Sequence, residues 1–258
     1  MPKFAANLTM MFNECDFPER FPAAAQAGFD AVEFLFPYDY PAADVGRWLK
    51  DNRLKNILFN LPPGDWAAGE RGIAALPGRE NEFREGVAKA IEYALVLGPS
   101  QLHMMAGLIP EGADLALHRK TYLENMKYAA QELAKHQLHL LLEPINTRDM
   151  PGYFLNTQSQ AHELRHECGE PNVKVQMDFY HAQIMEGDLI ETFKKYFEGI
   201  GHTQIASVPT RNEPDDGEVN YTYLFKMLDE LGYEGWIGCE YRPRGKTEDG
   251  LAWLRPYK

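Results

Sequence analysis

The sequence has few cysteines and no long hydrophobic run. Its three cysteines, Cys15, Cys168 and Cys239, are an odd number without a C-x-x-C spacing, which argues against a disulfide framework and against a cysteine-based zinc site. No apolar stretch approaches the roughly 20 residues that a membrane span requires. The opening residues MPKFAANL lack the hydrophobic region and cleavage site of a signal peptide. We therefore expect a cytoplasmic protein without a membrane partner.

Positive charge is also scarce. The 258-residue chain carries 26 Lys and Arg residues against 38 Asp and Glu residues, a formal net charge of −12 at pH 7, and no basic cluster stands out. Proteins that bind nucleic acid normally need such a cluster to contact phosphates, so we expect no nucleic-acid partner. An anionic substrate would instead need a local positive centre, which a bound divalent cation can supply even in an acidic protein.

Short β-rich runs alternate with longer helical patterns along the chain. The runs predict strands at residues 4–8, 31–35, 56–59, 101–105, 139–143, 173–178, 202–206 and 236–240. The clearest predicted helices between them cover 79–97, 115–136, 158–167 and 189–197. Strands that alternate with helices indicate βαβ units and a parallel sheet. Because eight such units fill about 250 residues in known barrels, we predict an α/β fold, a single (β/α)8 TIM barrel domain over residues 1–258.

One predicted helix and one long loop indicate how this barrel is covered and where it opens. The helix at 115–136 has an apolar stripe made of Leu123, Met126, Ala130 and Leu133. Such a stripe is expected to pack on the barrel wall. The longest irregular stretch, 60–78, follows the third strand and exceeds the usual loop length of about 2–6 residues. We expect it to be a lid or a binding loop.

Four polar side chains stand at or near the ends of the last four predicted strands, where a barrel interior is otherwise aliphatic. They are Glu143, Asp178, Gln204 and Glu240. Alternation along the strand puts Glu143 on the inward face with Leu141, and Pro144 keeps the backbone of Glu143 extended. The strand ends of a (β/α)8 barrel form the face where active sites lie. We therefore expect the four side chains to converge.

Three carboxylates and one amide oxygen form an oxygen-rich ligand set. Without a cation, three carboxylates at one point would repel one another. Oxygen ligands suit Mg²⁺ or Mn²⁺ better than zinc, so we predict one of these divalent metals. Taken alone, each of these four residues is also consistent with a structural role, as a polar group at a strand end that pairs with a nearby loop. His181, three residues after Asp178, is placed to hydrogen-bond the substrate or a ligating carboxylate.

A small anionic substrate also needs donors for its own carboxylate. Arg71 in the long loop and Arg211 after the seventh strand are candidates, with His103 at the end of the fourth strand as a further wall residue. The alternative for each arginine is a solvent-exposed salt bridge. Trp66 and Tyr153 lie on loops, where they either cover the substrate or anchor the loop to the barrel.

Six stretches carry a resemblance to a known family along nearly the whole chain. They are FAANLTMMF at Phe4, GFDAVEFLFPYDY at Gly28, GDWAAGERGIA at Gly64, LPGRE at Leu76, LLEPINTRDMPGYFL at Leu141 and GWIGCEYRPRG at Gly235. In these stretches the chain resembles the hydroxypyruvate isomerases of the xylose isomerase-like barrel superfamily. The resemblance implies a divalent metal bound by Glu143, Asp178, Gln204 and Glu240. It also implies that Glu143 and Glu240 carry protons.

The implied reaction interconverts hydroxypyruvate and tartronate semialdehyde, which differ in the position of one carbonyl group. A proton leaves one carbon and another arrives on its neighbour, through an enediolate whose charge the metal stabilises. Isomerases of four-carbon 2-oxo acids and ketose 3-epimerases remain open as alternatives. The acidic net charge and the lack of clustered histidines disfavour an abasic-site endonuclease. The presence of both Glu143 and Glu240 disfavours a barrel that binds metal without catalysing a reaction.

Overall fold

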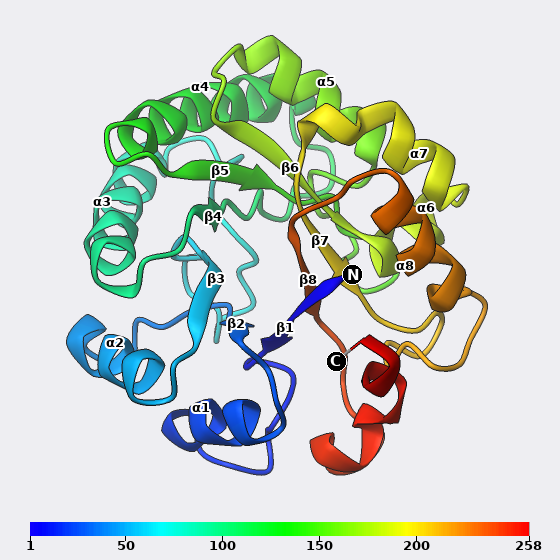
Figure 1. Ribbon diagram of the computed structural model, residues 1–258. Coiled ribbons are helices and arrows are strands. Elements are labelled where there is room, and N and C mark those ends of the chain that lie inside the picture. The colour runs from blue at the N-terminus through cyan, green and yellow to red at the C-terminus, as the bar shows by residue number, and fades with distance from the viewer. Residues whose placement is uncertain (258) are drawn as a thin grey trace.

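The computed structural model describes residues 1–257 and confirms the predicted (β/α)8 barrel (Figure 1). Each strand pairs in parallel with the next, and β8 pairs with β1 to close the sheet. The strands are β1 Lys3–Asn7, β2 Ala31–Glu33, β3 Lys55–Asn60, β4 Gln101–His103, β5 His139–Leu142, β6 Val173–Asp178, β7 Ile200–Ile205 and β8 Trp236–Cys239. The α-helices are α1 Phe17–Gln26, α2 Ala42–Asp51, α3 Glu80–Leu97, α4 Leu115–Ala134, α5 Gln158–Cys168, α6 Phe179–Met185, α7 Leu189–Tyr196 and α8 Tyr221–Glu230. Two 3₁₀ segments, η1 Phe197–Gly199 and η2 Thr247–Tyr257, complete the described chain.

The predicted strands are all present, but their ends shift by a few residues. β5 ends at Leu142 and β8 ends at Cys239, so Glu143 and Glu240 each stand one residue beyond their strand. Pro144 contributes to this end at β5, because proline has no N–H with which to extend a ladder. The two glutamates therefore lie at the rim of the barrel, where the strands give way to loops.

A short helix, α6, follows β6 directly and was not among the predicted elements. Asp178 ends β6 and also caps α6, because its Oδ1 accepts a hydrogen bond from the backbone N–H of Tyr180 at 2.7 Å. An aspartate in this position satisfies one of the unpaired N–H groups of the first helical turn. Since α6 begins at Phe179, His181 lies in its first turn and is brought back toward the strand ends.

The apolar stripe predicted for α4 is confirmed. Met126, Ala130 and Leu133 are fully buried, and Leu123 is partly buried and packs against the same core. Tyr122 is fully buried as well, because it stands four residues before Met126 and thus on the same face of the helix.

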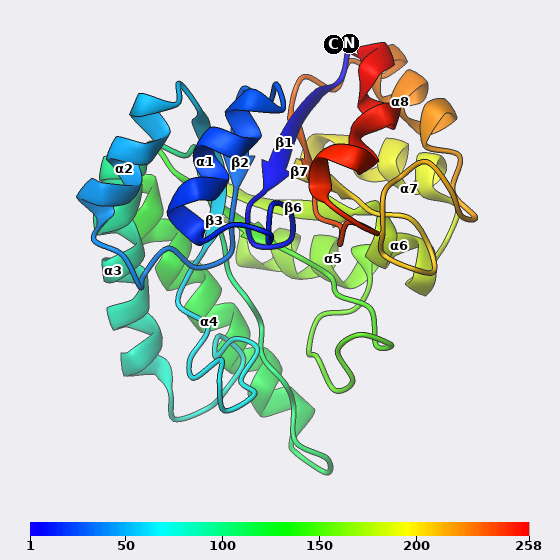
Figure 2. The same cartoon turned by 90° about the horizontal axis from the view of Figure 1, so that it is seen from below.

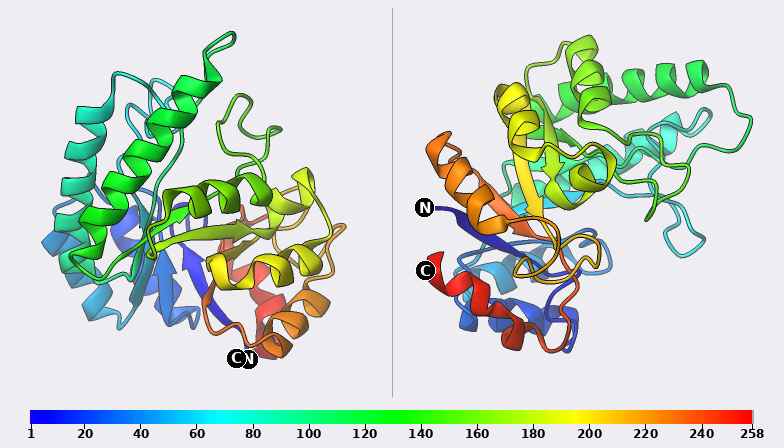
Figure 3. Two further views of the ribbon diagram at one scale, coloured as in Figure 1. Left: turned by 90° about the horizontal axis from the view of Figure 1, so that it is seen from above. Right: turned by 90° about the vertical axis from the view of Figure 1, so that its right-hand side faces the viewer.

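The two ends of the described chain lie side by side at one end of the barrel, and long loops project from the other end (Figures 2 and 3). The strands point toward the loops, so the loop end is the carboxyl end of the barrel, where barrel enzymes place their sites. The loop at 60–78 and the loop after β5 are among those that project there. Within residues 1–257, no helix is both long enough and apolar enough to cross a membrane.

A close backbone approach at Gly72 holds the loop at 60–78 against the barrel. Gly72 forms an isolated antiparallel bridge with Ala106, just after β4. Its φ is +102°, and a Cβ at this position would lie 2.3 Å from the carbonyl oxygen of Met105. Only glycine combines this backbone conformation with so close a contact. The loop is thus fixed at its centre.

We expect Gly72→Ala to lower the free energy of unfolding by about 2–5 kcal/mol, because it adds both backbone strain and a clash with the backbone. Gly69→Ala is the matched control, since its φ is +97° but, apart from Gly69 and its two chain neighbours, the described chain has no heavy atom within 4 Å of the added Cβ. That change should cost only about 1–2 kcal/mol. Urea unfolding of both variants measures the difference, and equal losses would refute the role of the close approach.

Candidate active site at the carboxyl end of the barrel

A cavity of about 520 Å³ opens at the loop end of the barrel. Seven of the eight side chains predicted from the sequence line it, namely Glu143, Gln204, Glu240, His181, His103, Arg71 and Arg211. The eighth, Asp178, is fully buried, and its Oδ2 lies 3.6 Å from Nε2 of His181. The structure therefore brings all the predicted site residues into or beside one cavity.

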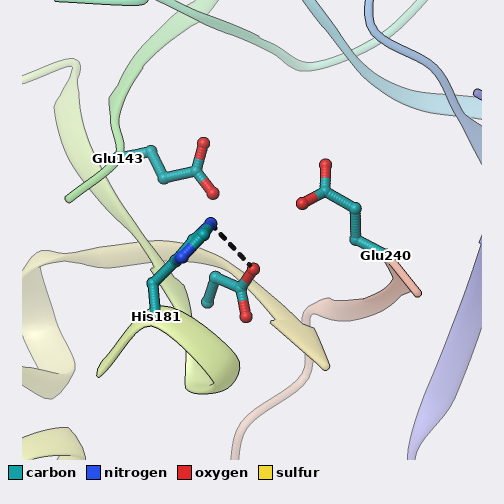
Figure 4. Close-up of side chains that lie close together, drawn as sticks. Glu143, His181 and Glu240 are labelled. Atoms are coloured by element: carbon teal, nitrogen blue, oxygen red, sulfur yellow. Dashed lines mark ion pairs between the residues drawn. The ribbon is translucent and has the colours of Figure 1, made fainter. Parts of the chain in front are cut away.

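Three buried carboxylates and one imidazole meet in this cavity. Glu143, Asp178, His181 and Glu240 each place one potential ligand atom within 4.8 Å of the others. The carboxylates of Glu143 and Glu240 approach from opposite sides, with the ring of His181 below Glu143 (Figure 4). The glutamates follow β5 and β8, which are not neighbours in the sheet. This separation gives the cavity two carboxylates that face the same space from different directions.

Burial and repulsion make this cluster unfavourable when all its carboxylates are ionised. Burial, followed by the charges of Glu240 and Asp178, raises the pKa of Glu143 well above its ordinary value. Burial also raises the pKa of Glu240 to about 8 and that of Asp178 to about 6, although Arg211 opposes both shifts. A divalent cation would favour the ionised forms, because its charge offsets both the burial and the repulsion.

Two oxygens in the cluster fit a cation because the protein leaves them unpaired. Within residues 1–257, Oε1 of Glu143 and Oδ2 of Asp178 are buried and have no hydrogen-bond partner. Buried carboxylate oxygens normally have a hydrogen bond or a metal ion. Asp178 already uses its other oxygen to cap α6. The donor set thus fits the oxygen-preferring divalent metal predicted from the sequence.

The amide of Gln204 is held at both ends. Its Nε2 donates to Oε1 of Glu33 at 2.7 Å, and its Oε1 accepts from Nε2 of Gln176 at 2.5 Å. Gln176 also hydrogen-bonds Glu143 and so lowers the pKa of that carboxyl, against the larger effect of burial. The amide oxygen of Gln204 therefore faces Gln176. A metal-binding role for Gln204 remains a prediction.

The position of the proton on His181 follows from its contacts with Asn146. Oδ1 of Asn146 accepts backbone N–H bonds from Arg148 at 3.0 Å and from Asp149 at 2.8 Å, so its Nδ2 faces Nδ1 of His181 at 2.6 Å. Because this Nδ2 can only donate, Nδ1 of His181 is the acceptor. Burial lowers the pKa of His181 well below its ordinary value, so the ring is neutral. Nε2 then carries the proton and lies 3.6 Å from Oδ2 of Asp178 and 3.5 Å from Nη2 of Arg211, itself a donor.

His103 lines the cavity as a neutral wall residue. Its Nδ1 lies 3.2 Å from Oδ1 of Asn60 and 3.6 Å from Oε2 of Glu143. Burial, followed by the charge of His202, lowers the pKa of His103 to about 3. In the described part of the chain its Nε2 has no partner. The ring therefore lies in the cavity wall with one nitrogen unpaired, and its contact with a bound molecule remains a prediction.

The two predicted arginines differ in how the protein holds them. Arg211 has a φ of +57°, and its Nη2 donates to Oε2 of Glu240 at 2.7 Å while Nη1 donates to Oδ2 of Asp149 at 3.2 Å. It is thus the cation nearest the carboxylates. Arg71 instead stacks on Trp66, with its guanidinium carbon 4.0 Å from the ring centroid, and donates to the backbone oxygen of Glu70 at 2.7 Å. Contact of either arginine with a substrate carboxylate remains a prediction.

The two loop aromatics have different positions. Trp66 lines the cavity, is 36% exposed and packs against Phe36 with ring centroids 5.0 Å apart. Tyr153 is buried, and its hydroxyl accepts the backbone N–H of Ala106 at 2.8 Å. Trp66 is therefore the one placed to cover a bound molecule, whereas Tyr153 anchors its loop.

Several cavity residues were missed from the sequence. They include Asn7, Glu33, Gln176, Asp149 and Tyr180, all of which line the cavity. A signal for three of them was present, since Asn7 and Glu33 end β1 and β2 and Gln176 stands two residues before Asp178 on the same face of β6. Asp149 and Tyr180 lie on a loop and on α6, and no strand pattern points to them.

This fold and site define a class of protein. It is a (β/α)8 barrel whose carboxyl end holds a buried group of carboxylates that fits a divalent cation. The family model described as "Xylose isomerase-like TIM barrel" matches residues 21–257. The chain belongs to the xylose isomerase-like TIM barrel family.

Full-length relatives agree with this membership. The chain is 59% identical over 257 residues to a 2-oxo-tetronate isomerase from Cupriavidus necator, with 100% of this chain and 99% of the relative covered. It is 50% identical over 258 residues to the hydroxypyruvate isomerase of Escherichia coli, with 100% of both chains covered. It is also similar to a crystal structure described as an AP endonuclease, family 2, from Brucella melitensis, with a TM-score of 0.98, 56% identity and 100% of both chains covered. The resemblance seen in the sequence motifs is confirmed.

The arrangement of Asn146 and His181 predicts the effect of Asn146→Asp. The new carboxylate can still accept the two backbone N–H bonds, but it presents an acceptor to Nδ1 of His181. The ring proton should therefore move from Nε2 to Nδ1, which ¹⁵N NMR of the histidine ring detects. Asn156→Asp is the control, because Asn156 donates to the backbone oxygen of Ile145 at 2.9 Å instead. An unchanged ¹⁵N pattern in Asn146→Asp would refute the assignment.

Proposed function

We propose that this protein is a metal-dependent isomerase that interconverts hydroxypyruvate and tartronate semialdehyde (2-hydroxy-3-oxopropanoate) by proton transfer through an enediolate. The observation that carries the proposal is the pair of buried carboxylates, Glu143 and Glu240, on two sides of one cavity. The hydroxypyruvate isomerase of E. coli, which is 50% identical over its full length, supports the choice of substrate. A small anionic hydroxy-keto acid is thus the expected partner.

The residues that fit the metal are Glu143, Asp178, Gln204 and Glu240, and Mg²⁺ or Mn²⁺ is the expected ion. When bound, such a cation polarises the substrate carbonyl and stabilises negative charge on the substrate oxygens. The protein supplies the proton carriers. One glutamate removes a proton from the hydroxymethyl carbon of hydroxypyruvate, and a proton is delivered to the neighbouring carbonyl carbon, while the hydroxyl proton passes between the two oxygens. Glu143 and Glu240 suit this role because their carboxylates face the cavity from two directions.

His181 and the arginines have supporting roles in this proposal. The Nε2–H of His181 donates a hydrogen bond to a substrate oxygen, because Asn146 keeps the proton on that nitrogen. Arg211 and Arg71 bind the substrate carboxylate, and His103 forms part of the wall. Trp66 excludes water at the mouth of the cavity.

Isomerisation of a four-carbon 2-oxo-tetronate is the second candidate function. The observation that favours it is the 59% identity to the 2-oxo-tetronate isomerase of C. necator, which exceeds the 50% identity to the E. coli enzyme. The two substrates share the hydroxy-keto acid group and differ in length, so the same proton carriers serve both. The net charge of −12 does not favour abasic DNA as a substrate. A cytoplasmic location remains a prediction.

We expect protein stripped of metal by a chelator to lose isomerase activity and to regain it with Mg²⁺ or Mn²⁺. The restored protein should be assayed with hydroxypyruvate, with 2-oxo-tetronates, with ketoses and with a DNA duplex that contains one abasic site. The largest kcat/KM is expected for hydroxypyruvate, and no incision of DNA is expected. A preference for a 2-oxo-tetronate above about tenfold, roughly 1.4 kcal/mol in the transition state, would select the second candidate. Full activity in metal-free protein would overturn the mechanism.

Glu143→Gln and Glu240→Gln should each lower kcat by at least about 10²-fold, because each removes a proton carrier and keeps the shape of the side chain. In D₂O the wild-type protein should place deuterium on the product carbon that gains hydrogen. Early time points and a control without enzyme correct for spontaneous enolisation. Quantitative transfer of substrate-derived hydrogen, with no solvent deuterium in the product, would instead indicate a hydride shift and would leave the glutamates as ligands only.

A further inference from the structure

A fourth carboxylate, Glu33, lines the cavity and takes no part in the chemistry proposed above. It ends β2 and is 1% exposed. Its Oε1 accepts hydrogen bonds from Nδ2 of Asn7 at 3.0 Å and from Nε2 of Gln204 at 2.7 Å. Its Oε2 lies 2.8 Å from Nε2 of His202. One buried carboxylate therefore connects β2 with β1 and with β7.

The barrel leaves room for this carboxylate at Gly238. Gly238 is paired in register with Gln204 of β7, and a Cβ at this position would lie 2.4 Å from each carboxylate oxygen of Glu33. Any side chain at 238 would therefore compete with the carboxylate for the same space. The space left by the glycine and the three hydrogen bonds together fix the position of the Glu33 carboxylate.

These contacts decide which end of the Gln204 amide faces Glu33 and which end points away from it. A carboxylate oxygen accepts hydrogen bonds, so Glu33 selects the NH₂ end of the amide. The oxygen end is left toward Gln176, whose Nε2 donates to it at 2.5 Å. With the two ends exchanged, Gln204 would present N–H groups to a cation and would not act as an oxygen ligand.

Asn7 extends the same contact toward Glu240. Its Oδ1 accepts the backbone N–H of Thr9 at 3.0 Å, so its Nδ2 faces the carboxylates. That Nδ2 lies 3.0 Å from Glu33 and 3.3 Å from Oε1 of Glu240. Glu33 thus contacts the amide of one expected ligand, Gln204, directly, and Asn7 connects it to a second, Glu240.

We propose that Glu33 is a positioning residue for the metal centre, which orients Gln204 so that its oxygen faces the cation. The inference rests on the proposed function, since it requires a metal bound by Glu143, Asp178, Gln204 and Glu240. Glu33 acts through Gln204, because its own two oxygens are taken up by Asn7, Gln204 and His202.

The test is a double-mutant cycle on Mn²⁺ affinity, read from free Mn²⁺ by electron paramagnetic resonance. Glu33→Gln keeps the shape of the side chain but presents an amide that no longer selects one end of Gln204. We expect it to raise the Kd for Mn²⁺ by at least about tenfold. In a Gln204→Ala background the same change should raise the Kd by less than about twofold, because no amide remains to be oriented.

Glu213→Gln is the matched control. Glu213 is 2% exposed, accepts from Nε of Arg244 at 2.9 Å and is not among the described residues that line the cavity. Its loss should lower stability and leave Mn²⁺ affinity unchanged. If Glu33→Gln does not fold, Gly238→Ala replaces it in the cycle, because the added methyl group displaces the carboxylate of Glu33.

The outcomes distinguish a failure of the proposed function from a failure of the role of Glu33. Wild-type protein that binds no Mn²⁺ overturns the proposed function. Wild-type binding with unchanged affinity in Glu33→Gln overturns only the role of Glu33. If Glu33→Gln lowers Mn²⁺ affinity equally in the wild-type and Gln204→Ala backgrounds, that role is also overturned, because Glu33 then does not act through the amide of Gln204.

Discussion

Electrostatic repulsion among buried carboxylates is the constraint on which the site depends. Glu143, Asp178 and Glu240 are all buried within a few ångströms of one another. Burial and mutual charge both disfavour their ionised forms, so the barrel must surround them with donors. Arg211 meets Glu240, and the N-terminus of α6 meets Asp178. The donors stop short of complete pairing, and the carboxylate oxygens left over are the ones that fit a cation.

Much of this site is predictable because a parallel barrel fixes where strand ends go. Alternation along each strand and the common direction of all strands place Glu143 and Glu240 at one end before any contact is known. Gln176 and Glu33 obey the same rule, but Gln176 stands two residues before the end of β6, and Glu33 ends β2, outside the last four strands.

The remaining features depend on loops and on orientation, which residue periodicity does not specify. The pairing of Arg211 with Glu240 requires a left-handed backbone in the loop after β7. The donor nitrogen of His181 depends on which way the amide of Asn146 points, and that is set by backbone N–H groups in the loop after β5. A sequence shows that an amide is present but not which end of it faces a neighbour.

The contact between Gly238 and Glu33 links two positions that are far apart in the chain. Since a Cβ at 238 and the carboxylate at 33 would occupy the same volume, the order of substitutions matters during divergence. A side chain at 238 displaces the carboxylate unless position 33 has become shorter, whereas a shorter residue at 33 leaves a void until 238 fills it. We therefore expect a larger residue at one of these positions to be accompanied by a smaller residue at the other.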